Sequence, residues 1–273
     1  MCGERVRVRL DIAYEGTEFS GWAIQPGRRT VQGELQAGLA TVLRLPSVAL
    51  MVAGRTDAGV HAIGQVAHAD LPAQQWAEVG PRLLHKLDGV LPADIQVSRI
   101  REVPADFDAR FSALWRRYEY RISDSEVGAD PLRRRQVLSI RRHLDDAAMA
   151  EAARGLLGLH DFVGFCKWRA GGTTIRTLQE FGVARIDDEI VCTVQADAFC
   201  HSMVRSLVGA LIAVGDGHRP ADWPASLLGL QRRCAQIGVA PAHGLTLMQV
   251  GYPPADQFAA RSAQTRVRRE IPS

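Results

Sequence analysis

The order of predicted secondary-structure elements repeats along this chain. Strict apolar alternation predicts strands, and apolar residues three to four apart predict helices. The first half is predicted to contain a strand at 5–14, a helix at 31–44, strands at 48–53 and 60–69, a helix at 74–87 and a strand at 95–103. The second half is predicted to contain a strand at 113–122, a helix at 145–157, strands at 176–186 and 189–197, a helix at 202–214, an additional helix at 222–232 and a strand at 245–251.

This repeat predicts the domain organisation. Two tandem βαββαβ (ferredoxin-like) halves predict an α+β protein with a mainly antiparallel sheet flanked by helices. The pattern leaves open whether the two sheets lie side by side or form separate lobes. We expect an N-terminal half at 1–108, a C-terminal half at 109–255, and a polar, disordered tail at 256–273.

Composition narrows the class of protein. The chain has 273 residues, of which 47% are hydrophobic, so it can bury a sizeable core. Its five cysteines are odd in number and lack CxxC spacing, which argues against a disulfide framework and a zinc site and suits a reducing cytoplasm. The histidines have no metal-like spacing. Because no apolar run reaches 18 residues and no signal region is present, we expect neither membrane insertion nor secretion.

The basic residues are almost all arginines. Of 33 lysines and arginines only Lys86 and Lys167 are lysines, which leaves 31 arginines. A net charge of +3 is too small to indicate nucleic-acid binding by itself. The guanidinium group suits phosphates and bases, although biased coding composition explains the excess equally well. The clusters that could follow an RNA backbone are Arg28-Arg29, Arg116-Arg117, Arg133-Arg134-Arg135 and Arg141-Arg142.

A single carboxylate lies between two glycines where two predicted strands meet. Residues 54–62 read Gly-Arg-Thr-Asp-Ala-Gly-Val-His-Ala, and Gly54 and Gly59 permit positive φ and close backbone approach. Asp57 at this turn could act as nucleophile, general base or electrostatic stabiliser. The alternative is a hairpin turn in which Asp57 only bonds its own backbone.

Arg205 is an unusual residue for its predicted helix. The helix at 202–214 is apolar on nearly all sides, which predicts burial, and its dipole disfavours a cation in the first turn. A buried charge needs a partner, and Asp57 is the expected one; the pair would keep Asp57 ionised and fix its rotamer. The alternative is a surface arginine that extends to solvent.

Residues 54–62 resemble the signature of the bacterial tRNA pseudouridine synthase A family, because every residue of the family block Gly-Arg-Thr-Asp-Ala-Gly-Val-His-Ala is present. The resemblance extends over roughly residues 5–252. The other blocks that are similar to family motifs lie at 14–22, 30–35, 117–120, 158–162, 174–177 and 199–209.

The resemblance implies a fold and an activity. It implies one continuous sheet with a central cleft between the halves. It implies a cytoplasmic isomerase that converts uridine to pseudouridine at positions 38, 39 and 40 in the anticodon stem-loop of tRNA, with no metal and no small-molecule cofactor. It also implies a homodimer in which one tRNA spans both subunits.

The resemblance also implies roles for three side chains. Asp57 starts the reaction by attacking the sugar or the base, or by removing a sugar proton, and the sequence leaves these routes open. Arg205 orients Asp57 and keeps it ionised. Tyr118 holds the target base and assists proton removal from C5, although the alternation at 114–122 by itself predicts a strand aromatic in the core.

Further residues are expected around the substrate. Leu245, which follows Gly244 as in the family, either closes the other side of the pocket or packs in the core. The arginines expected to contact tRNA are Arg55, Arg28, Arg29 and Arg116. The chain departs from the family at Ala23, where glutamine is usual, and at 135–140, which lacks aromatics; both departures concern how the tRNA is held.

Two other classes of function remain open at this point. A noncatalytic RNA-binding protein would use paired ferredoxin-like units without chemistry, and Asp57 would be dispensable. A glycosidase or base-exchange enzyme would use Asp57 as a nucleophile and release free base. That class usually needs a second carboxylate, and none accompanies Asp57 in its motif.

Overall fold

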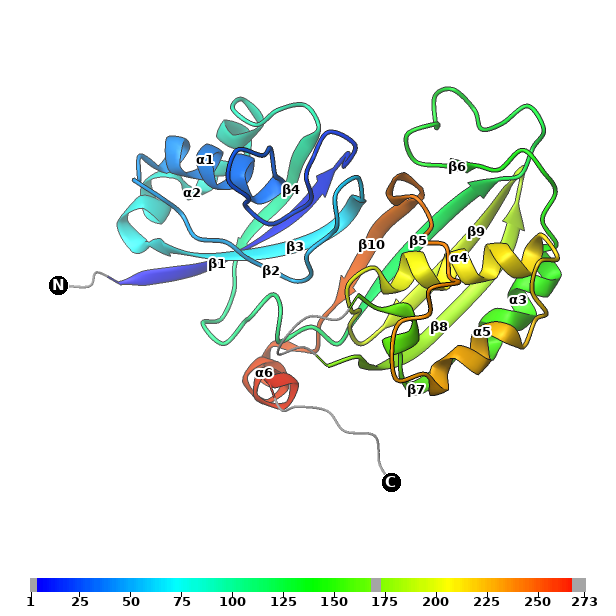
Figure 1. The fold of residues 1–273 in the computed structure, drawn as a ribbon. Helices are drawn as coiled ribbons and strands as arrows, with labels where there is room; N and C mark the ends of the chain where they lie inside the picture. Colours follow the sequence, from blue (N-terminus) through cyan, green and yellow to red (C-terminus); the bar gives the residue numbers. More distant parts are fainter. Residues whose placement is uncertain (1–3, 168–172, 267–273) are drawn as a thin grey trace. The chain divides into compact units, whose positions relative to one another are not determined.

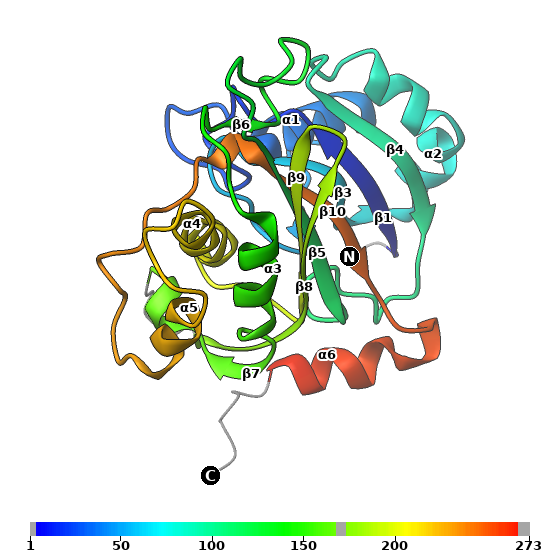
Figure 2. The same ribbon diagram turned by 90° about the vertical axis from the view of Figure 1, so that its right-hand side faces the viewer.

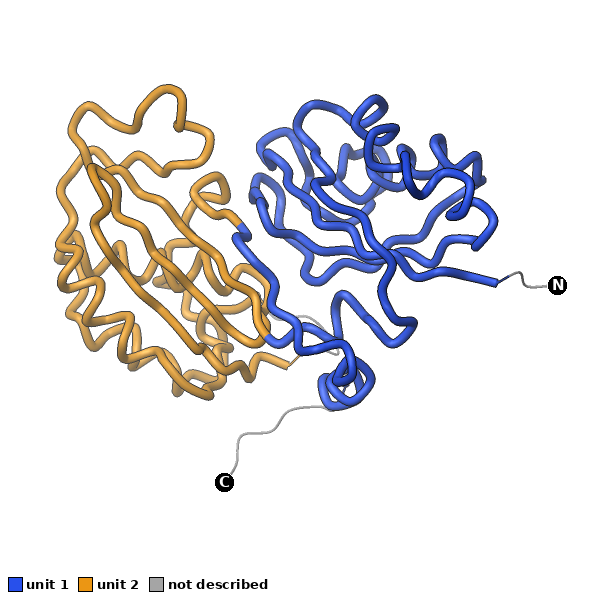
Figure 3. Tube along the Cα trace, turned by 180° about the vertical axis from the view of Figure 1, so that it is seen from behind, with its two compact units in different colours: residues 1–114, 247–267 blue, residues 115–246, 268–273 orange. Residues whose placement is uncertain are grey.

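The computed structural model describes residues 4–167 and 173–266. The chain divides into two compact units, shown in Figure 3. Unit 1 comprises residues 1–114 and 247–267, and unit 2 comprises residues 115–246 and 268–273. Across the described ranges, no helix is both long and apolar enough to span a membrane.

Unit 1 contains an antiparallel sheet and the helices α1 (Val31–Leu43) and α2 (Ala73–Asp88), which pack against each other (Figure 1), and it also contains α6 (Phe258–Arg266). Its strand order is β4-β1-β3, β2 also pairs with β3, and residues 247–251 of β10 follow β3. Its elements are β1 (Arg5–Tyr14), α1 (Val31–Leu43), β2 (Met51–Val52), β3 (His61–Pro72), α2 (Ala73–Asp88), β4 (Ile95–Glu102), the part of β10 (Leu245–Gly251) from residue 247 onward, the 3₁₀ helix η4 (Ala255–Gln257) and α6 (Phe258–Arg266).

Unit 2 has the strand order β5-β9-β8-β7, all antiparallel, and a short β6 that runs parallel to β5. Helices α3, α4 and α5 lie on one face of this sheet, as Figure 1 and Figure 2 both show. Its elements are β5 (Trp115–Ser123), β6 (Leu138–Ser139), α3 (Asp146–Arg154), β7 (Gly158–Asp161), η1 (Val163–Phe165), β8 (Ile175–Ile186), β9 (Glu189–Ala196), α4 (Met203–Gly215), α5 (Trp223–Ser226), η2 (Leu227–Gly229) and η3 (Ala242–Gly244).

The predicted fold class is confirmed: the protein is α+β, with mostly antiparallel sheet flanked by helices. Local sequence patterns explain why these strands and helices form where they were predicted. In β1, Val8, Leu10 and Ile12 are buried while the alternate residues are not, because successive strand side chains point to opposite faces. Thr30 caps α1 as predicted, since its hydroxyl accepts the N–H of Gly33 at 3.3 Å. The central cleft stays a prediction.

Two predicted elements are shorter in the structure. The strand expected at 48–53 is paired only at Met51–Val52, although Val48 and Leu50 are buried beside it. The helix expected at 222–232 is the single turn α5, followed by η2. Burial produces an apolar pattern in irregular segments as well as in strands and helices, which explains both differences.

The segment after residue 255 differs from the expected disordered tail. Residues 258–266 form α6, and residues 267–273 lie outside the described part of the chain. Phe258 is buried against Phe107, with ring centroids 5.1 Å apart, and Arg261 donates to the carbonyl of Ala113. One apolar residue in a polar sequence therefore anchors this helix to unit 1.

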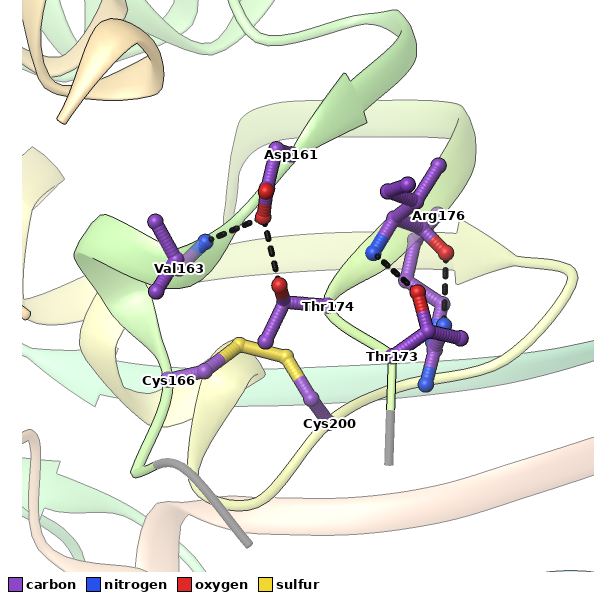
Figure 4. Close-up of a disulfide and its surroundings, with 8 residues drawn as sticks. Asp161, Val163, Cys166, Thr173, Thr174, Arg176 and Cys200 are labelled. Carbon is purple, nitrogen blue, oxygen red and sulfur yellow. Dashed lines mark hydrogen bonds between the residues drawn. A yellow bond between two sulfur atoms is a disulfide. The ribbon is translucent and has the colours of Figure 1, made fainter. Parts of the chain in front are cut away.

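A disulfide joins Cys166 and Cys200 in unit 2, which the cysteine spacing argued against (Figure 4). Their Cα atoms are 5.9 Å apart although 34 residues separate them, because the end of η1 and the segment before α4 converge. Beside them Asp161 accepts hydrogen bonds from the N–H of Val163 and the hydroxyl of Thr174. Sequence spacing carries no information on such tertiary convergence.

Candidate active site

Asp57 lies in unit 1, on the connection between β2 and β3. Its side chain is half-buried, and that of the neighbouring Arg55 is exposed. Two backbone hydrogen bonds stabilise this connection. The N–H of Ala53 donates to the carbonyl of Val66 at 2.8 Å, and the N–H of Val60 donates to the carbonyl of Asp57 at 3.2 Å. Residues 53–60, hereafter the Asp57 loop, are thus a defined turn at the end of a sheet.

The segment that follows β1 packs directly on this loop. The N–H of Trp22 donates to the carbonyl of Thr56 at 3.1 Å, and the N–H of Gly59 donates to the carbonyl of Phe19 at 3.3 Å. The side chain of His61 is buried, and its Nδ1 accepts the N–H of Gly16 at 2.9 Å. Residues 15–22 therefore support the Asp57 loop along its length.

Glycines make this close packing possible. A Cβ on Gly16 would lie 2.1 Å from the carbonyl oxygen of Val60, and a Cβ on Gly21 would lie 2.8 Å from that of Thr56. Gly59 has a φ of 79°, as the sequence predicts, in the left-handed region that favours glycine. The same expectation was wrong for Gly54, which has no positive φ and no described heavy atom within 4 Å of a Cβ placed on it.

Tyr118 lies on β5 of unit 2. Its residue pairs with Val194 of β9, its side chain is only 7% exposed, and its ring makes an edge-to-face contact with Phe199 at 5.2 Å between centroids. Strand pairing and the perpendicular ring contact restrict the rotamer of Tyr118.

Arg205 lies in the first turn of α4, as predicted. Its Nε donates to the carbonyl of Ala240 at 2.7 Å, and the N–H of Ala240 donates to the carbonyl of Arg205 at 3.0 Å. Four residues later, a Cβ on Gly209 would lie 1.8 Å from the carbonyl oxygen of Gly238. The start of α4 is therefore fixed against the chain that leads into β10.

A second tyrosine, which the sequence reading did not single out, lies near Arg205. The hydroxyl of Tyr120 donates to the carbonyl of Pro241 at 2.8 Å, and Gly244 packs against its ring. Burial raises the pKa of Tyr120, and the charge of Arg205 lowers it by less. Leu245 follows Gly244 and is buried. The sequence feature that could have identified Tyr120 is the alternation along β5, which places its side chain on the same face of the sheet as that of Tyr118.

The four arginines expected to contact tRNA fall into two kinds. Arg29 bonds Asp94 through both terminal nitrogens and Glu34 through Nε, and these bonds raise its pKa. Arg116 is buried and donates to the carbonyl of Asp197 at 2.8 Å. Arg28 and Arg55 are exposed. Arg29 and Arg116 are thus engaged within their own units, and Arg28 and Arg55 face solvent.

The structure distributes the predicted site over both units. Asp57 and Arg55 lie in unit 1, and Tyr118, Arg205 and Leu245 lie in unit 2. The pairing of Asp57 with Arg205 concerns side chains of different units and stays a prediction. Within the described ranges no group of His, Cys, Asp and Glu side chains has the arrangement of a metal site.

These features define an α+β protein that carries a half-buried carboxylate on a hydrogen-bonded, glycine-bordered turn. The model of one family, described as tRNA pseudouridine synthase, matches residues 12–112 and 152–253. The chain belongs to this family, whose members isomerise uridine to pseudouridine in tRNA.

Relatives are similar in sequence to this protein over nearly its whole length. The tRNA pseudouridine synthase A of Streptomyces avermitilis is 56% identical over 272 residues, which is 98% of this chain and 95% of that protein. The protein of the same name from Mycobacterium leprae is 49% identical over 96% of this chain and 95% of its own length. A chain in the "Crystal Structure of a Cbf5-Nop10-Gar1 Complex" has a TM-score of 0.32 and 12% identity over 75% of this chain and 54% of that chain.

Proposed function

We propose that this protein converts uridine to pseudouridine at positions 38, 39 and 40 in the anticodon stem-loop of tRNA, with Asp57 as the catalytic carboxylate. The observation that carries the proposal is the Asp57 loop, because Gly16, Gly21 and Gly59 hold a half-buried carboxylate on a turn within the family-matched residues. The names of the relatives support tRNA as the substrate.

The reaction rearranges one nucleotide. The bond between N1 of the base and C1′ of the sugar breaks, the base turns in place, and a bond forms between C5 and C1′. N1 gains a proton and C5 loses one, so no group, electron or cofactor is consumed. The target base must first leave its stack, which costs a few kcal/mol that contacts to the RNA must supply.

Each predicted residue has a part in this reaction. Asp57 starts it by attacking C1′ or the base, or by removing a proton from the sugar. Arg205 orients Asp57 and favours its ionised form, since a bidentate guanidinium lowers the pKa of a carboxyl group. Tyr118 holds the turned base and helps to take the proton from C5, and Leu245 closes the pocket.

The phosphates are contacted by exposed arginines, of which Arg28 and Arg55 are the first candidates. Arg29 and Arg116 are bonded to protein atoms, so we assign them the role of holding the protein structure beside the RNA rather than of contacting phosphates. We place the reaction in the cytoplasm, in a homodimer whose two subunits share one tRNA, as the resemblance to the family implies.

The experiment that tests the proposal measures tritium release from tRNA transcripts labelled at C5 of uridine. We compare the unmodified protein with Asp57→Ala and with Asp88→Ala, which removes an exposed carboxylate at the end of α2. Binding of tRNA by all three proteins is measured in parallel. We expect release by the unmodified protein and by Asp88→Ala, and none by Asp57→Ala, which still binds tRNA.

Other outcomes would point elsewhere. Tight binding of tRNA without any tritium release by the unmodified protein would identify a noncatalytic RNA-binding protein. Appearance of free uracil would identify a glycosidase, since an isomerase keeps the base attached to the RNA. Release that survives Asp57→Ala would remove Asp57 from the catalytic role.

A further inference from the structure

Three buried polar side chains form a hydrogen-bond chain behind the Asp57 loop. They are Tyr14, the last residue of β1; Gln65, in β3; and Thr56, which directly precedes Asp57. Their exposures are 5%, 0% and 7%. The hydroxyls of Tyr14 and Thr56 are 2.8 Å apart, and Nε2 of Gln65 lies 3.2 Å from the Tyr14 hydroxyl.

The hydrogen bonds of the Gln65 side chain have defined directions, because its amide has two N–H donors and one carbonyl acceptor. Oε1 of Gln65 accepts the N–H of Val66, which fixes the orientation of the amide. One hydrogen of Nε2 then goes to the carbonyl of Gly54 at 2.9 Å and the other to the Tyr14 hydroxyl. The Tyr14 oxygen is therefore an acceptor from Gln65, and it shares a further hydrogen bond with the Thr56 hydroxyl, in which either oxygen can be the donor.

Burial keeps this chain intact over the working pH range. It raises the pKa of Tyr14 to about 12, with its hydrogen bonds opposing the shift, so the hydroxyl retains its hydrogen near neutral pH. A buried polar atom without a partner is costly, so the side chains stay in the arrangement that satisfies all of them. The Thr56 carbonyl is held as well, by the N–H of Trp22.

The Asp57 loop is thus fixed at Gly54 and at Thr56 by the buried side chains of Gln65 and Tyr14. We propose that Tyr14 and Gln65 are positioning residues for the reaction: they hold the backbone on which Asp57 stands, so that its carboxylate meets the reacting atoms at the required distance. This proposal rests on the function proposed above. It adds residues from β1 and β3 whose side chains lie behind the loop rather than in it.

A positioning role differs from a purely structural one in what it changes. A structural hydrogen bond contributes to the stability of unit 1 alone. A positioning bond also governs how often the catalytic group is in place, so its loss lowers kcat and leaves substrate binding nearly unchanged. The two roles are separated by comparing kcat, KM and unfolding for matched variants.

The first test is Tyr14→Phe, which removes the hydroxyl and keeps the ring. Its matched control is Tyr252→Phe, because the Tyr252 hydroxyl also donates a hydrogen bond within unit 1, to the carbonyl of Ala109 at 2.7 Å. With tRNA labelled at C5 we expect Tyr14→Phe to lower kcat by about tenfold or more, with KM within about twofold of the unmodified protein. Tyr252→Phe keeps kcat.

The second test keeps or removes the hydroxyl of residue 56, which is the hydrogen-bond partner of the Tyr14 hydroxyl. Thr56→Ser keeps an Oγ for Tyr14, and we expect nearly full activity. Thr56→Val has the shape of threonine without the hydroxyl, and we expect the same loss of kcat as in Tyr14→Phe. Equal activity of the serine and valine variants would contradict the proposal.

A third measurement does not depend on turnover. Arg55 is exposed and lies within the Asp57 loop, so trypsin cleavage after Arg55 reports how often the loop opens. We expect Tyr14→Phe to be cleaved there several times faster than the unmodified protein, and Tyr252→Phe at the unmodified rate. If cleavage and kcat are both unchanged in Tyr14→Phe, the positioning role is overturned. An inactive unmodified protein would instead overturn the proposed function.

Discussion

Gly16 lies against the backbone of Val60 so closely that a methyl group on Gly16 would stand 2.1 Å from the Val60 carbonyl oxygen. Because backbone atoms cannot move aside as a flexible side chain does, Gly16→Ala must shift residues 15–22 or the Asp57 loop. We expect it to cost about 1–3 kcal/mol of unfolding free energy and to lower C5 tritium release by more than tenfold. Denaturant unfolding and the release assay check these two values.

The control for this substitution is Gly182→Ala in β8 of unit 2. No described heavy atom lies within 4 Å of a Cβ at Gly182, and its φ is not positive. We expect a stability change within about 0.5 kcal/mol and unchanged tritium release. An alanine at residue 16 that behaved like the alanine at residue 182 would show that the contact with Val60 is not restrictive.

Local sequence patterns were sufficient to predict those features of the structure that depend on residues close together along the chain. The alternation of β1 identified its buried face, and Thr30 identified the start of α1, because a hydroxyl before a helix satisfies an N–H of the first turn. The motif at 54–62 indicated a special turn for Asp57, and the positive φ of Gly59 agrees with it. These features depend on contacts within a few residues.

Features that depend on distant partners could not be predicted in this way. Tyr14 and Thr56 are 42 residues apart, and only the antiparallel register of β1 with β3 brings them together. Cys166 and Cys200 likewise meet through tertiary structure. Arg29 looked like a candidate RNA contact because its partner Asp94 lies 65 residues away.

Arg28 and Arg29 are adjacent in sequence and are expected to respond differently to substitution. Arg29 holds Asp94 and Glu34 and lies 4.2 Å from the ring centre of Phe19, whereas Arg28 is exposed. We expect Arg29→Gln to reduce unfolding free energy by about 1–3 kcal/mol, because it leaves partly buried carboxylates without their cation. We expect Arg28→Gln to keep stability and to weaken tRNA binding. Thermal unfolding and a binding titration separate these effects, and loss of stability in both variants would contradict the assignment.

The segments before and after the short strand β6 carry exposed arginines that suit an RNA backbone. Arg134 and Arg141 are exposed, whereas Arg121 on β5 is paired with Glu119 and Glu189. If both exposed side chains contact phosphates, the double variant Arg134→Gln/Arg141→Gln should reduce the slope of log K against log salt by about 1–2. Arg121→Gln serves as the control and should keep the slope. A slope that is the same in all three proteins would place the tRNA backbone elsewhere.

Asp124 is expected to make the stability of unit 2 depend on pH in acid. Its side chain is 6% exposed and bonds Arg185 at 2.8 and 3.0 Å, and its Oδ2 also accepts the N–H of Leu144 at 3.0 Å. The hydrogen bonds from Arg185, more than any other cause, lower the pKa of Asp124 from 3.8 to about 2. Since the folded pKa is below the unfolded one, this stabilisation is complete above about pH 4 and is lost as the pH falls through about 2.

Asp124→Asn removes the ionisable group and keeps its size. We expect it to cost about 2 kcal/mol at pH 7, the free energy that corresponds to the pKa shift, and we expect the difference from the unmodified protein to shrink below pH 4. Denaturant unfolding at pH 7, 4 and 3 measures this, with Asp88→Asn as an exposed control that changes stability by less than about 0.5 kcal/mol at each pH. A cost for Asp124→Asn that stays constant from pH 7 to pH 3 would mean that the charge of Asp124 is not what stabilises its bonds to Arg185 and Leu144.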